Sequence, residues 1–371
     1  MNPAASQSCD SPSPLLSRDW DILIMGGGVI GLAIGLELRI QDDRLRVLVI
    51  EQQQVGAGAS WAAAGMLAPQ AENISDPRLA ELCQRSLQLY PDWIERVEER
   101  GQLPAGYWNC GILKPLSYPA ENGLTRPQLD HLQPHLGSQI TSAIWLPQEG
   151  QVDNRLLLPA LKSAFLQAGG SLLENVSIQE CPHNSQQLLG IETALGMLRA
   201  QSYICCLGAW SGQMALPVLM TVFPRKGQMI ALQDPRQLLQ HILFGEDIYL
   251  VPRRDGRLLV GATVEEVGFL PGNTAGAVQD LLAAAIRLFP PLRELTVLES
   301  WWGFRPTTPD RLPILGSSPL SNLWLATGHD RNGILLAPIT ADWLAGLVLG
   351  KPVDPLLEAF SWRRRLATAS S

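Results

Sequence analysis

The chain has 371 residues, of which 46% are hydrophobic and 17% charged, and its formal net charge is −7. These values describe a globular protein with a sizeable core, organised as two domains or one large domain. The acidic balance excludes a typical nucleic-acid-binding protein, because contacts to phosphates need a stripe of clustered lysines and arginines.

The first 18 residues are rich in serine and proline and lack the apolar core of a signal peptide, so we expect residues 1–18 to be a disordered leader. No stretch has the uninterrupted apolar length of a transmembrane helix. The six cysteines show no CxxC or metal-ligand spacing, and no metal site is expected. We therefore predict a cytoplasmic protein without membrane association.

The most informative stretch is residues 21–51. An apolar run typical of a strand leads into Gly26-x-Gly28-x-x-Gly31, then into a helical apolar pattern and a second strand that ends at Glu51. This order is the dinucleotide-binding fingerprint of a Rossmann-like fold. Gly28 leaves room for a pyrophosphate, and Glu51 can accept hydrogen bonds from ribose hydroxyls. The motif alone does not distinguish FAD from NAD.

A loop of small residues follows, with the sequence QQQVGAGASWAAAGMLAPQAE. Small side chains allow the backbone to lie against a large planar ligand and to bind it through N–H groups. A close contact between helices is the alternative interpretation. We favour the ligand, because the loop leaves the second strand of the nucleotide-binding motif.

The glycine motif, Glu51 and residues 58–67 together resemble the FAD-binding start of the D-amino-acid oxidase superfamily. They are most similar to its glycine oxidase branch, the type associated with thiamine biosynthesis, and the resemblance spans most of residues 20–350. It implies an α/β fold in which a Rossmann-like FAD-binding domain is interleaved with an antiparallel-sheet substrate domain.

The resemblance also implies FAD rather than NAD. Relatives of the sarcosine oxidase type attach their flavin to a cysteine just before a Thr-Pro-Asp-like sequence, and residues 303–310 contain no cysteine, so we predict non-covalent FAD. The candidate cofactor-binding residues are Gly26, Gly28, Val29, Ile30, Gly31, Glu51, Gln52, Ala59, Ser60, Ala64, Gly65, Met66, Val176, His329, Asp330, Arg331, Asn332, Gly333, Ile334 and Leu335.

The order of these segments predicts domains that alternate along the chain. A hairpin is expected over residues 248–261, with an Asp-Gly turn at Asp255. A helix is expected to start near Asn332 and to direct its N-terminus at the cofactor. The predicted FAD-binding domain comprises residues 19–75, 143–220 and 299–371, and the predicted substrate domain comprises residues 76–142 and 221–298.

Three residues are candidates for binding the substrate. Arg305 lies between tryptophans and a proline, and a guanidinium fork matches a carboxylate bidentately. A structural ion pair or stacking on tryptophan is the alternative. The resemblance implies that Arg305 anchors the substrate carboxylate, that Tyr249 assists it, and that Arg331 lies close to substrate and flavin. Arg331 could instead be a surface residue, and His329 is not expected to act as a catalytic base.

The resemblance finally implies an enzyme, a FAD-dependent oxidase of glycine and other small amines. It would oxidise a neutral amine by hydride transfer to flavin, reduce O2 to H2O2, and supply glycine imine for the thiazole moiety of thiamine. A thiazole-forming enzyme is then a candidate partner, and a homo-oligomer is expected.

Two alternatives stay open at this point. A D-amino-acid or sarcosine-type oxidase or dehydrogenase would differ in its substrate profile and electron acceptor. A non-catalytic flavin-binding assembly protein would hold FAD that no small amine reduces.

Overall fold

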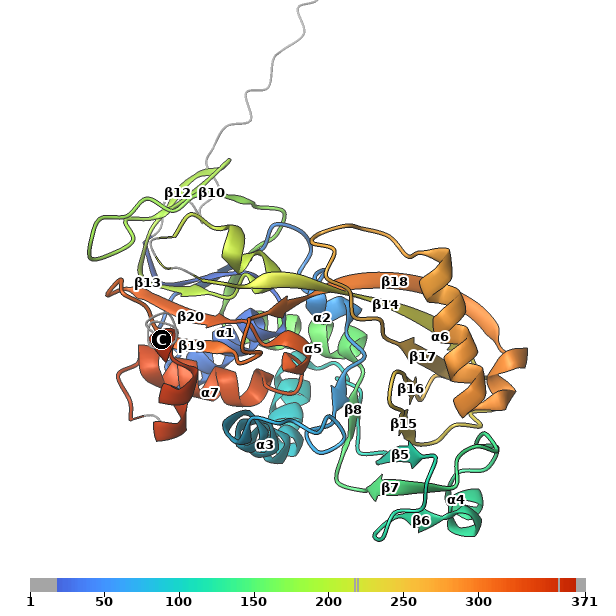
Figure 1. The fold of residues 1–371 in the computed structure, drawn as a ribbon. Helices are drawn as coiled ribbons and strands as arrows, with labels where there is room; N and C mark the ends of the chain where they lie inside the picture. Colours follow the sequence, from blue (N-terminus) through green and yellow to red (C-terminus); the bar gives the residue numbers. More distant parts are fainter. Residues whose placement is uncertain (1–18, 217, 219, 353, 365–371) are drawn as a thin grey trace, which may run out of the picture.

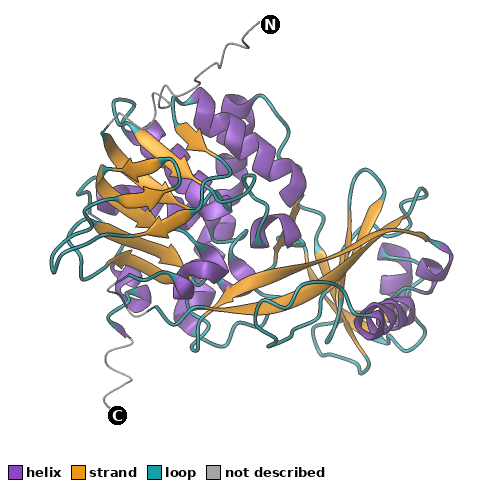
Figure 2. Ribbon diagram, turned by 90° about the horizontal axis from the view of Figure 1, so that it is seen from above, coloured by secondary structure: helices purple, strands orange, loops and turns teal. Residues whose placement is uncertain are grey.

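A computed structural model describes residues 19–216, 218, 220–352 and 354–364. The predicted leader, residues 1–18, lies outside the described residues. The described part of the chain forms two large sheets and two small three-stranded sheets. Figures 1 and 2 show the large sheets side by side, with long strands that run from one toward the other.

The first large sheet has six strands and contains the predicted nucleotide-binding motif. Neighbouring strands pair in parallel, except for one antiparallel pair at the edge. Its two central apolar strands are almost fully buried, as expected where both faces of a parallel sheet are covered. The strand order is β19 (Ile314–Ser317), β20 (Leu323–Thr327), β13 (Ala200–Cys205), β1 (Trp20–Met25), β2 (Val47–Ile50) and β9 (Ser171–Leu173).

Four helices cover one face of this sheet and form the largest apolar core. They gather on one side of the sheet in Figure 2. They are α1 (Val29–Gln41), α3 (Pro77–Gly101), α5 (Asn154–Gln167) and α7 (Ala337–Val348). The opposite face packs against a small sheet, β10 (Ile178–Glu180), β11 (Ile191–Thr193) and β12 (Gly196–Leu198).

The second large sheet has eight strands and is mostly antiparallel. The predicted hairpin is confirmed, because β16 and β17 pair antiparallel across a turn in which Gly256 has a φ of +84°. The strand order is β18 (Thr296–Thr307), β14 (Phe223–Gln233), β17 (Arg257–Gly261), β16 (Tyr249–Pro252), β15 (Ile242–Phe244), β5 (Ile112–Leu116), β7 (Ser142–Leu146) and β6 (Leu124–Thr125).

The two faces of the second sheet have different neighbours. The helix α6 (Ala275–Leu288) packs on one face, and α4 (Arg126–Leu132) lies beside the far strands. The other face buries Met229, Tyr249 and Trp301 against alanines of the small-residue loop. That loop contains α2 (Ala59–Ala62) and β3 (Met66–Leu67), which joins β8 (Gly150–Val152) and β4 (Tyr107–Trp108) in a small sheet.

The predicted division into domains remains a prediction. Two elements pack against the sheet of the other predicted domain. The helix α3 packs against α5 and α7 of the first sheet, because its apolar side chains, among them Tyr90 and Trp93, are buried there. The strand β18 pairs with β14 along its length and so lies in the second sheet, although residues from 299 onward were assigned to the FAD-binding domain.

The helix predicted to start near Asn332 starts later than expected. Asp330–Asn332 form a short 3₁₀ turn (η3), and α7 begins at Ala337 with Pro338 in its first turn. Positive φ angles at Gly328 and Asp330 turn the chain sharply after β20, which delays the regular helix. No described helix has the length and apolar content needed to span a membrane.

Candidate active site

A cavity of about 920 Å³ connects the glycine turn of the first sheet with the inner face of the second sheet. At one end it is lined by the residues that follow β1 and β2, including Gly28 and Glu51. At the other end it is lined by Met229, Tyr249 and Arg305. Its volume lies at the upper end of the range for small-molecule and cofactor sites, as a dinucleotide requires.

The glycine turn forms this end of the cavity through backbone geometry. Gly26 has a φ of +108°, and a Cβ there would overlap the carbonyl oxygen of Cys206, which directly follows the neighbouring strand β13. A Cβ at Gly31 would overlap the carbonyl oxygen of Gly26, so this glycine permits α1 to pack against the turn. Gly28 lines the cavity itself, and a Cβ there would lie 3.2 Å from the hydroxyl oxygen of Ser60.

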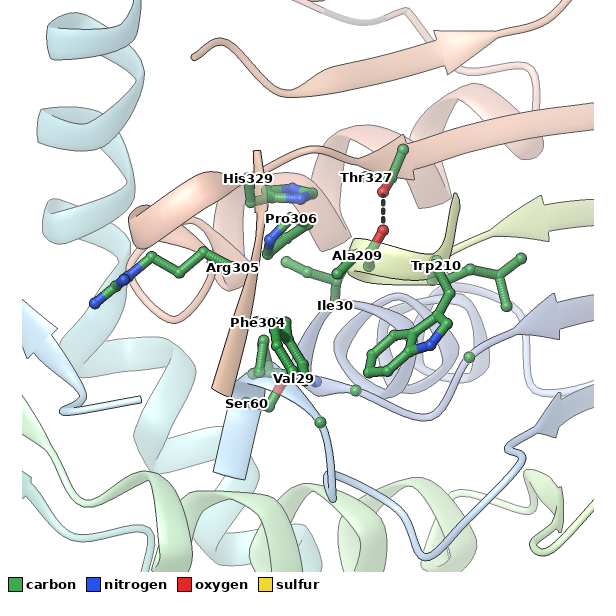
Figure 3. Close-up of a pocket in the computed structure, with 18 of the residues that line it drawn as sticks. Val29, Ile30, Ser60, Ala209, Trp210, Phe304, Arg305, Pro306, Thr327 and His329 are labelled. Carbon is green, nitrogen blue, oxygen red and sulfur yellow. Dashed lines mark hydrogen bonds between the residues drawn. The ribbon is translucent and has the colours of Figure 1, made fainter. Parts of the chain in front are cut away.

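Two polar side chains are held in place beside the turn. The Glu51 carboxylate accepts hydrogen bonds from the backbone N–H of Gly27 at 2.8 Å and of Gln53 at 3.0 Å. The Ser60 hydroxyl accepts from the N–H of Val29 at 3.0 Å, which leaves its own hydrogen for a ligand oxygen. Figure 3 shows Ser60 beside Val29 at the start of α1. This end therefore offers a helix N-terminus for phosphates and a fixed carboxylate for hydroxyls.

All of the predicted cofactor-binding residues line this cavity except Gly31 and Leu335. Gly31 serves the packing of α1, and Leu335 is buried in the core, where its carbonyl oxygen accepts a hydrogen bond from Ser86 at 2.6 Å. The structure thus brings together residues that are far apart in the sequence, while their role in binding FAD stays a prediction.

Sequence reasoning missed an aromatic wall of the cavity. Trp210 and Phe304 line it, their ring centroids are 6.4 Å apart, and Figure 3 shows both side chains beside Ala209 and Val29. The turn that carries Trp210 is held by Thr327, whose hydroxyl donates to the Gly208 carbonyl at 3.2 Å. The available signal was a small-residue turn directly after the buried strand β13, the same pattern as after β1.

The side chain of Arg305 fits over the neighbouring strand because Gly227 has no side chain there. The Arg305 side chain crosses Gly227 of β14, where a Cβ would lie 2.5 Å from Nη1. Nη1 donates to the carbonyl oxygens of Thr263 at 3.1 Å and Lys226 at 3.4 Å. In Figure 3 the side chain extends away from Phe304 and Pro306. These bonds fix the guanidinium at the cavity and leave other N–H groups for a carboxylate.

Tyr249 lies on β16 with its side chain in the same part of the cavity. Its hydroxyl donates to the sulfur of Met229 at 3.3 Å. Burial raises the pKa of Tyr249, an effect that the nearby cations Arg305 and Arg331 oppose. The phenol is therefore neutral at ordinary pH and can donate a hydrogen bond to a bound carboxylate.

Arg331 is ion-paired, with its Nε 3.0 Å from a carboxylate oxygen of Glu72. The Glu72 side chain is only 10% exposed and lines the cavity. Burial raises the pKa of Glu72, and Arg331 and then Arg305 oppose that shift. Sequence reasoning missed Glu72; its signal was a single acidic residue after a long run of small apolar ones, and only the fold brings it to Arg331.

His329 is buried, with Nε2 at 3.2 Å from the hydroxyl oxygen of Thr340. Burial lowers the pKa of His329 to about 3, so the imidazole is neutral at ordinary pH. Its neighbour Asp330 accepts a hydrogen bond from the Thr307 hydroxyl at 2.7 Å. These contacts give both residues structural partners, and it remains a prediction that His329 is not a catalytic base.

Comparison with known proteins decides the family. Residues 21–347 match the profile of the family described as FAD dependent oxidoreductase. The chain belongs to this family of FAD-dependent oxidoreductases. The predicted resemblance and fold class are thereby confirmed, and FAD is the cofactor of this family.

Relatives within the family include proteins named bifunctional protein ThiO/ThiG. That of a Synechocystis species is 45% identical over 363 residues, which cover 94% of this chain and 55% of the relative. The protein of this name from Trichormus variabilis is 43% identical over 370 residues, which cover 95% of this chain and 56% of that relative. The chain therefore spans about half the length of these curated relatives.

Other family members match along their whole length. The glycine oxidase of Geobacillus kaustophilus is 33% identical over 374 residues, which cover 95% of this chain and 98% of that protein. Its crystal structure superposes with a TM-score of 0.88 over 94% of this chain and 99% of that one. An iminodiacetate oxidase from a Chelativorans species is 27% identical, with a TM-score of 0.82 over 92% and 98% of the two chains.

Proposed function

We propose that this protein is a FAD-dependent amino-acid oxidase that deaminates glycine and other small amines. The observation that carries the proposal is one continuous cavity that joins a dinucleotide-binding turn to a half-buried arginine, Arg305, and a buried tyrosine, Tyr249. Similarity to glycine oxidases along their whole length supports the same substrate class.

The residues present fit FAD. Gly28 would admit the pyrophosphate, the Ser60 hydroxyl would donate to a phosphate oxygen, and Glu51 would accept from ribose hydroxyls. The absence of a cysteine from residues 303–310 supports non-covalent binding. When bound, FAD supplies the two-electron oxidation of the substrate's α-carbon, and O2 takes up the electrons to give H2O2.

The protein's own contribution is to bind and orient the substrate. Arg305 would hold the carboxylate of a small amino acid by two parallel hydrogen bonds, with Tyr249 donating a third. Because Arg305 is fixed by carbonyl oxygens of β14 and the chain beyond β17, the carboxylate would be held in one orientation. Trp210 and Phe304 would cover the cofactor from one side, and the orientation of the substrate by Arg305 and Tyr249 would account for much of the rate.

The wider role also belongs to this proposal. We infer that the imine product supplies the thiazole moiety of thiamine, and that a thiazole-forming enzyme is the partner, since the most similar relatives reported above are named as bifunctional ThiO/ThiG proteins. The described cysteines are free, which supports a cytoplasmic location. A homo-oligomer remains part of the proposal.

The test is an anaerobic titration of the purified protein with glycine, sarcosine and D-alanine, followed by the visible flavin spectrum. Bleaching by glycine, reversed by air with formation of peroxide, is the expected result. Bleaching by D-alanine alone would replace glycine oxidation with a D-amino-acid oxidase function. A bound flavin that none of the amines reduces would contradict the proposal and favour a non-catalytic flavoprotein.

A further inference from the structure

The proposed function assigns no role to Glu72, a largely buried carboxylate of the cavity. Glu72 lies between β3 and α3, on the loop that crosses the substrate end of the cavity, and it lines the same space as Tyr249 and Arg305. The negative charge of Glu72 would repel a substrate carboxylate and so does not suit a carboxylate-binding site. Its presence has to be explained by the other charged group of an amino acid, the ammonium.

The contacts of Glu72 leave part of its carboxylate free. Arg331 Nε lies 3.0 Å from Oε2, and within the described part of the chain no protein donor hydrogen-bonds Oε1. The side chain is nine-tenths buried, so solvent cannot replace the missing donors fully. A buried carboxylate has about four acceptor positions, and a single ion pair leaves most of them for a ligand.

Glu72 also separates the roles of the two arginines. Arg331 forms an ion pair with Glu72, whereas Arg305 Nη1 donates to two carbonyl oxygens and no carboxylate of the described residues forms an ion pair with it. A substrate carboxylate therefore gains more from Arg305, and one placed on Arg331 would be repelled by Glu72. The cavity then offers a cation for one end of a zwitterion and an anion for the other.

We propose that Glu72 binds the ammonium group of the substrate and accepts one proton from it before the α-carbon is oxidised. This inference rests on the proposed amino-acid oxidase function. An N–H bond of the ammonium breaks, an O–H bond forms on Glu72, and the electron pair stays on nitrogen. The resulting neutral amine can share its lone pair with the α-carbon as that carbon loses electrons, which an ammonium cannot do.

The environment of Glu72 suits a proton acceptor. Burial raises the pKa of its carboxyl group toward that of an ammonium, which narrows the gap that the transfer must cross. Because the reaction needs ionised Glu72, kcat/KM should rise as the pH increases through the pKa of Glu72. The charged or titratable groups that face Glu72 are Arg331, Arg305, Asp330, Lys114, Glu149, Cys83 and Tyr249.

The decisive variant is Glu72→Gln, which keeps the size of the side chain and removes its ability to take a proton. At pH 7 we expect kcat/KM for glycine to fall about 100-fold, a typical loss for general base catalysis. As the pH approaches the pKa of the free amine, the substrate arrives already neutral. The deficit should therefore shrink at least about tenfold between pH 7 and pH 10.

A binding measurement separates this role from a structural one. Acetate has a carboxylate and no amine, and its binding to the holoenzyme can be followed through the flavin spectrum. If Glu72 is the amine partner, acetate binds the Gln variant as tightly as wild type or more tightly, because a repelling charge is gone. If Glu72 only holds Arg331 in place, acetate binding weakens in parallel with kcat/KM at every pH, and the proposal is wrong.

The matched control is Glu37→Gln, which removes another buried carboxylate paired with an arginine, Arg96 at 3.5 Å, on α1 and outside the cavity. The Glu37→Gln variant should have the same pH profile and the same affinity for acetate as the wild type.

If Glu72→Gln loses its FAD, Glu72→Asp is tested instead. We expect it to lose less kcat/KM and to keep the wild-type pH profile; an altered pH profile would overturn the proposal. Failure of the proposed function is distinguishable, since wild type itself would then not be reduced by glycine.

Discussion

The two ends of the cavity are built in different ways. At the cofactor end, a glycine turn, one carboxylate and one hydroxyl are fixed by backbone hydrogen bonds within short stretches of the first sheet. At the substrate end, three charged side chains and one neutral phenol converge from four separate segments, with Arg305 on β18, Tyr249 on β16, Arg331 in η3 and Glu72 after β3.

This difference determines what each end can tolerate. The cofactor end depends on the absence of side chains, so it is sensitive to added atoms. The substrate end depends on a few charged side chains, of which Glu72 is nine-tenths buried and Arg305 half-buried, so it is sensitive to their removal. Changes at one end should therefore affect FAD content, and changes at the other should affect turnover with FAD still bound.

The largest effect is expected for Arg305→Ala. Loss of the only carboxylate anchor that we assign should lower kcat/KM for glycine about 1000-fold, or about 4 kcal/mol, while FAD content stays that of the wild type. Steady-state oxygen consumption and the flavin spectrum measure both. The control is Arg225→Ala. Arg225 lies on β14 directly opposite Arg305 in the strand register, and it does not line the cavity. Normal turnover in Arg305→Ala would remove the anchor role.

Arg253 follows β16 of the second sheet and joins it to the small-residue loop and to α5 of the first sheet. It is buried, and its guanidinium donates to the carbonyl oxygen of Ala64 at 2.9 Å and to the Asn154 amide oxygen at 3.1 Å. Arg253→Met leaves these acceptors unpaired, so we expect a loss of about 3 kcal/mol in the free energy of unfolding. Urea unfolding measures it, with the adjacent exposed Arg254→Met as control. A loss equal to that of the control would refute this role.

Gly28→Val tests the cofactor end. A Cβ there lies 3.2 Å from Ser60 Oγ, and the branched side chain would occupy the space assigned to the pyrophosphate. We expect FAD to bind about 30-fold more weakly, or about 2 kcal/mol, in titrations of the apoprotein. Gly276→Val is the control, because a Cβ at this position meets no atom within 4 Å. Equal FAD affinity in the two variants would argue against the opening motif.

The smallest effect concerns His329, which lies where the two ends meet. Its pKa is lowered to about 3 in the folded state, so the unfolded chain alone binds a proton there between about pH 6.5 and pH 3. The wild type therefore loses stability as the pH falls through this window. In His329→Gln this contribution is absent, and the stability difference between the two proteins should shrink by about 1 kcal/mol from pH 7 to pH 5.5. Urea unfolding at the two pH values would show a constant difference if this explanation is wrong.

The same comparison explains what could be predicted from the sequence. The turn and strands around Gly28 and the hairpin at Gly256 are local, because spacing and turn chemistry dictate them within a short stretch. The cofactor end was therefore largely predictable. Trp210 was not predicted to line the cavity, because a small-residue turn after a buried strand favours a structural role when only the sequence is considered.

At the substrate end, only residues in motifs that resemble those of the family could be predicted. Arg305 and Tyr249 were predicted in this way, and Glu72 was not, because its meaning depends on Arg331, which lies at the other end of the chain. The late start of α7 and the packing of α3 on the first sheet could not be predicted, for a related reason. Positive φ angles and tertiary burial, which the local sequence pattern does not specify, decide both.

The most direct test of this account is a crystal structure of the protein with FAD and acetate. We expect the nucleotide to lie along the turn at Gly28 and Glu51, with the acetate carboxylate bound by Arg305 and Tyr249 and the Glu72–Arg331 pair intact. Acetate bound to Arg331 instead, with Glu72 displaced and Arg305 still held by carbonyl oxygens alone, would contradict the assignment of the two charged groups.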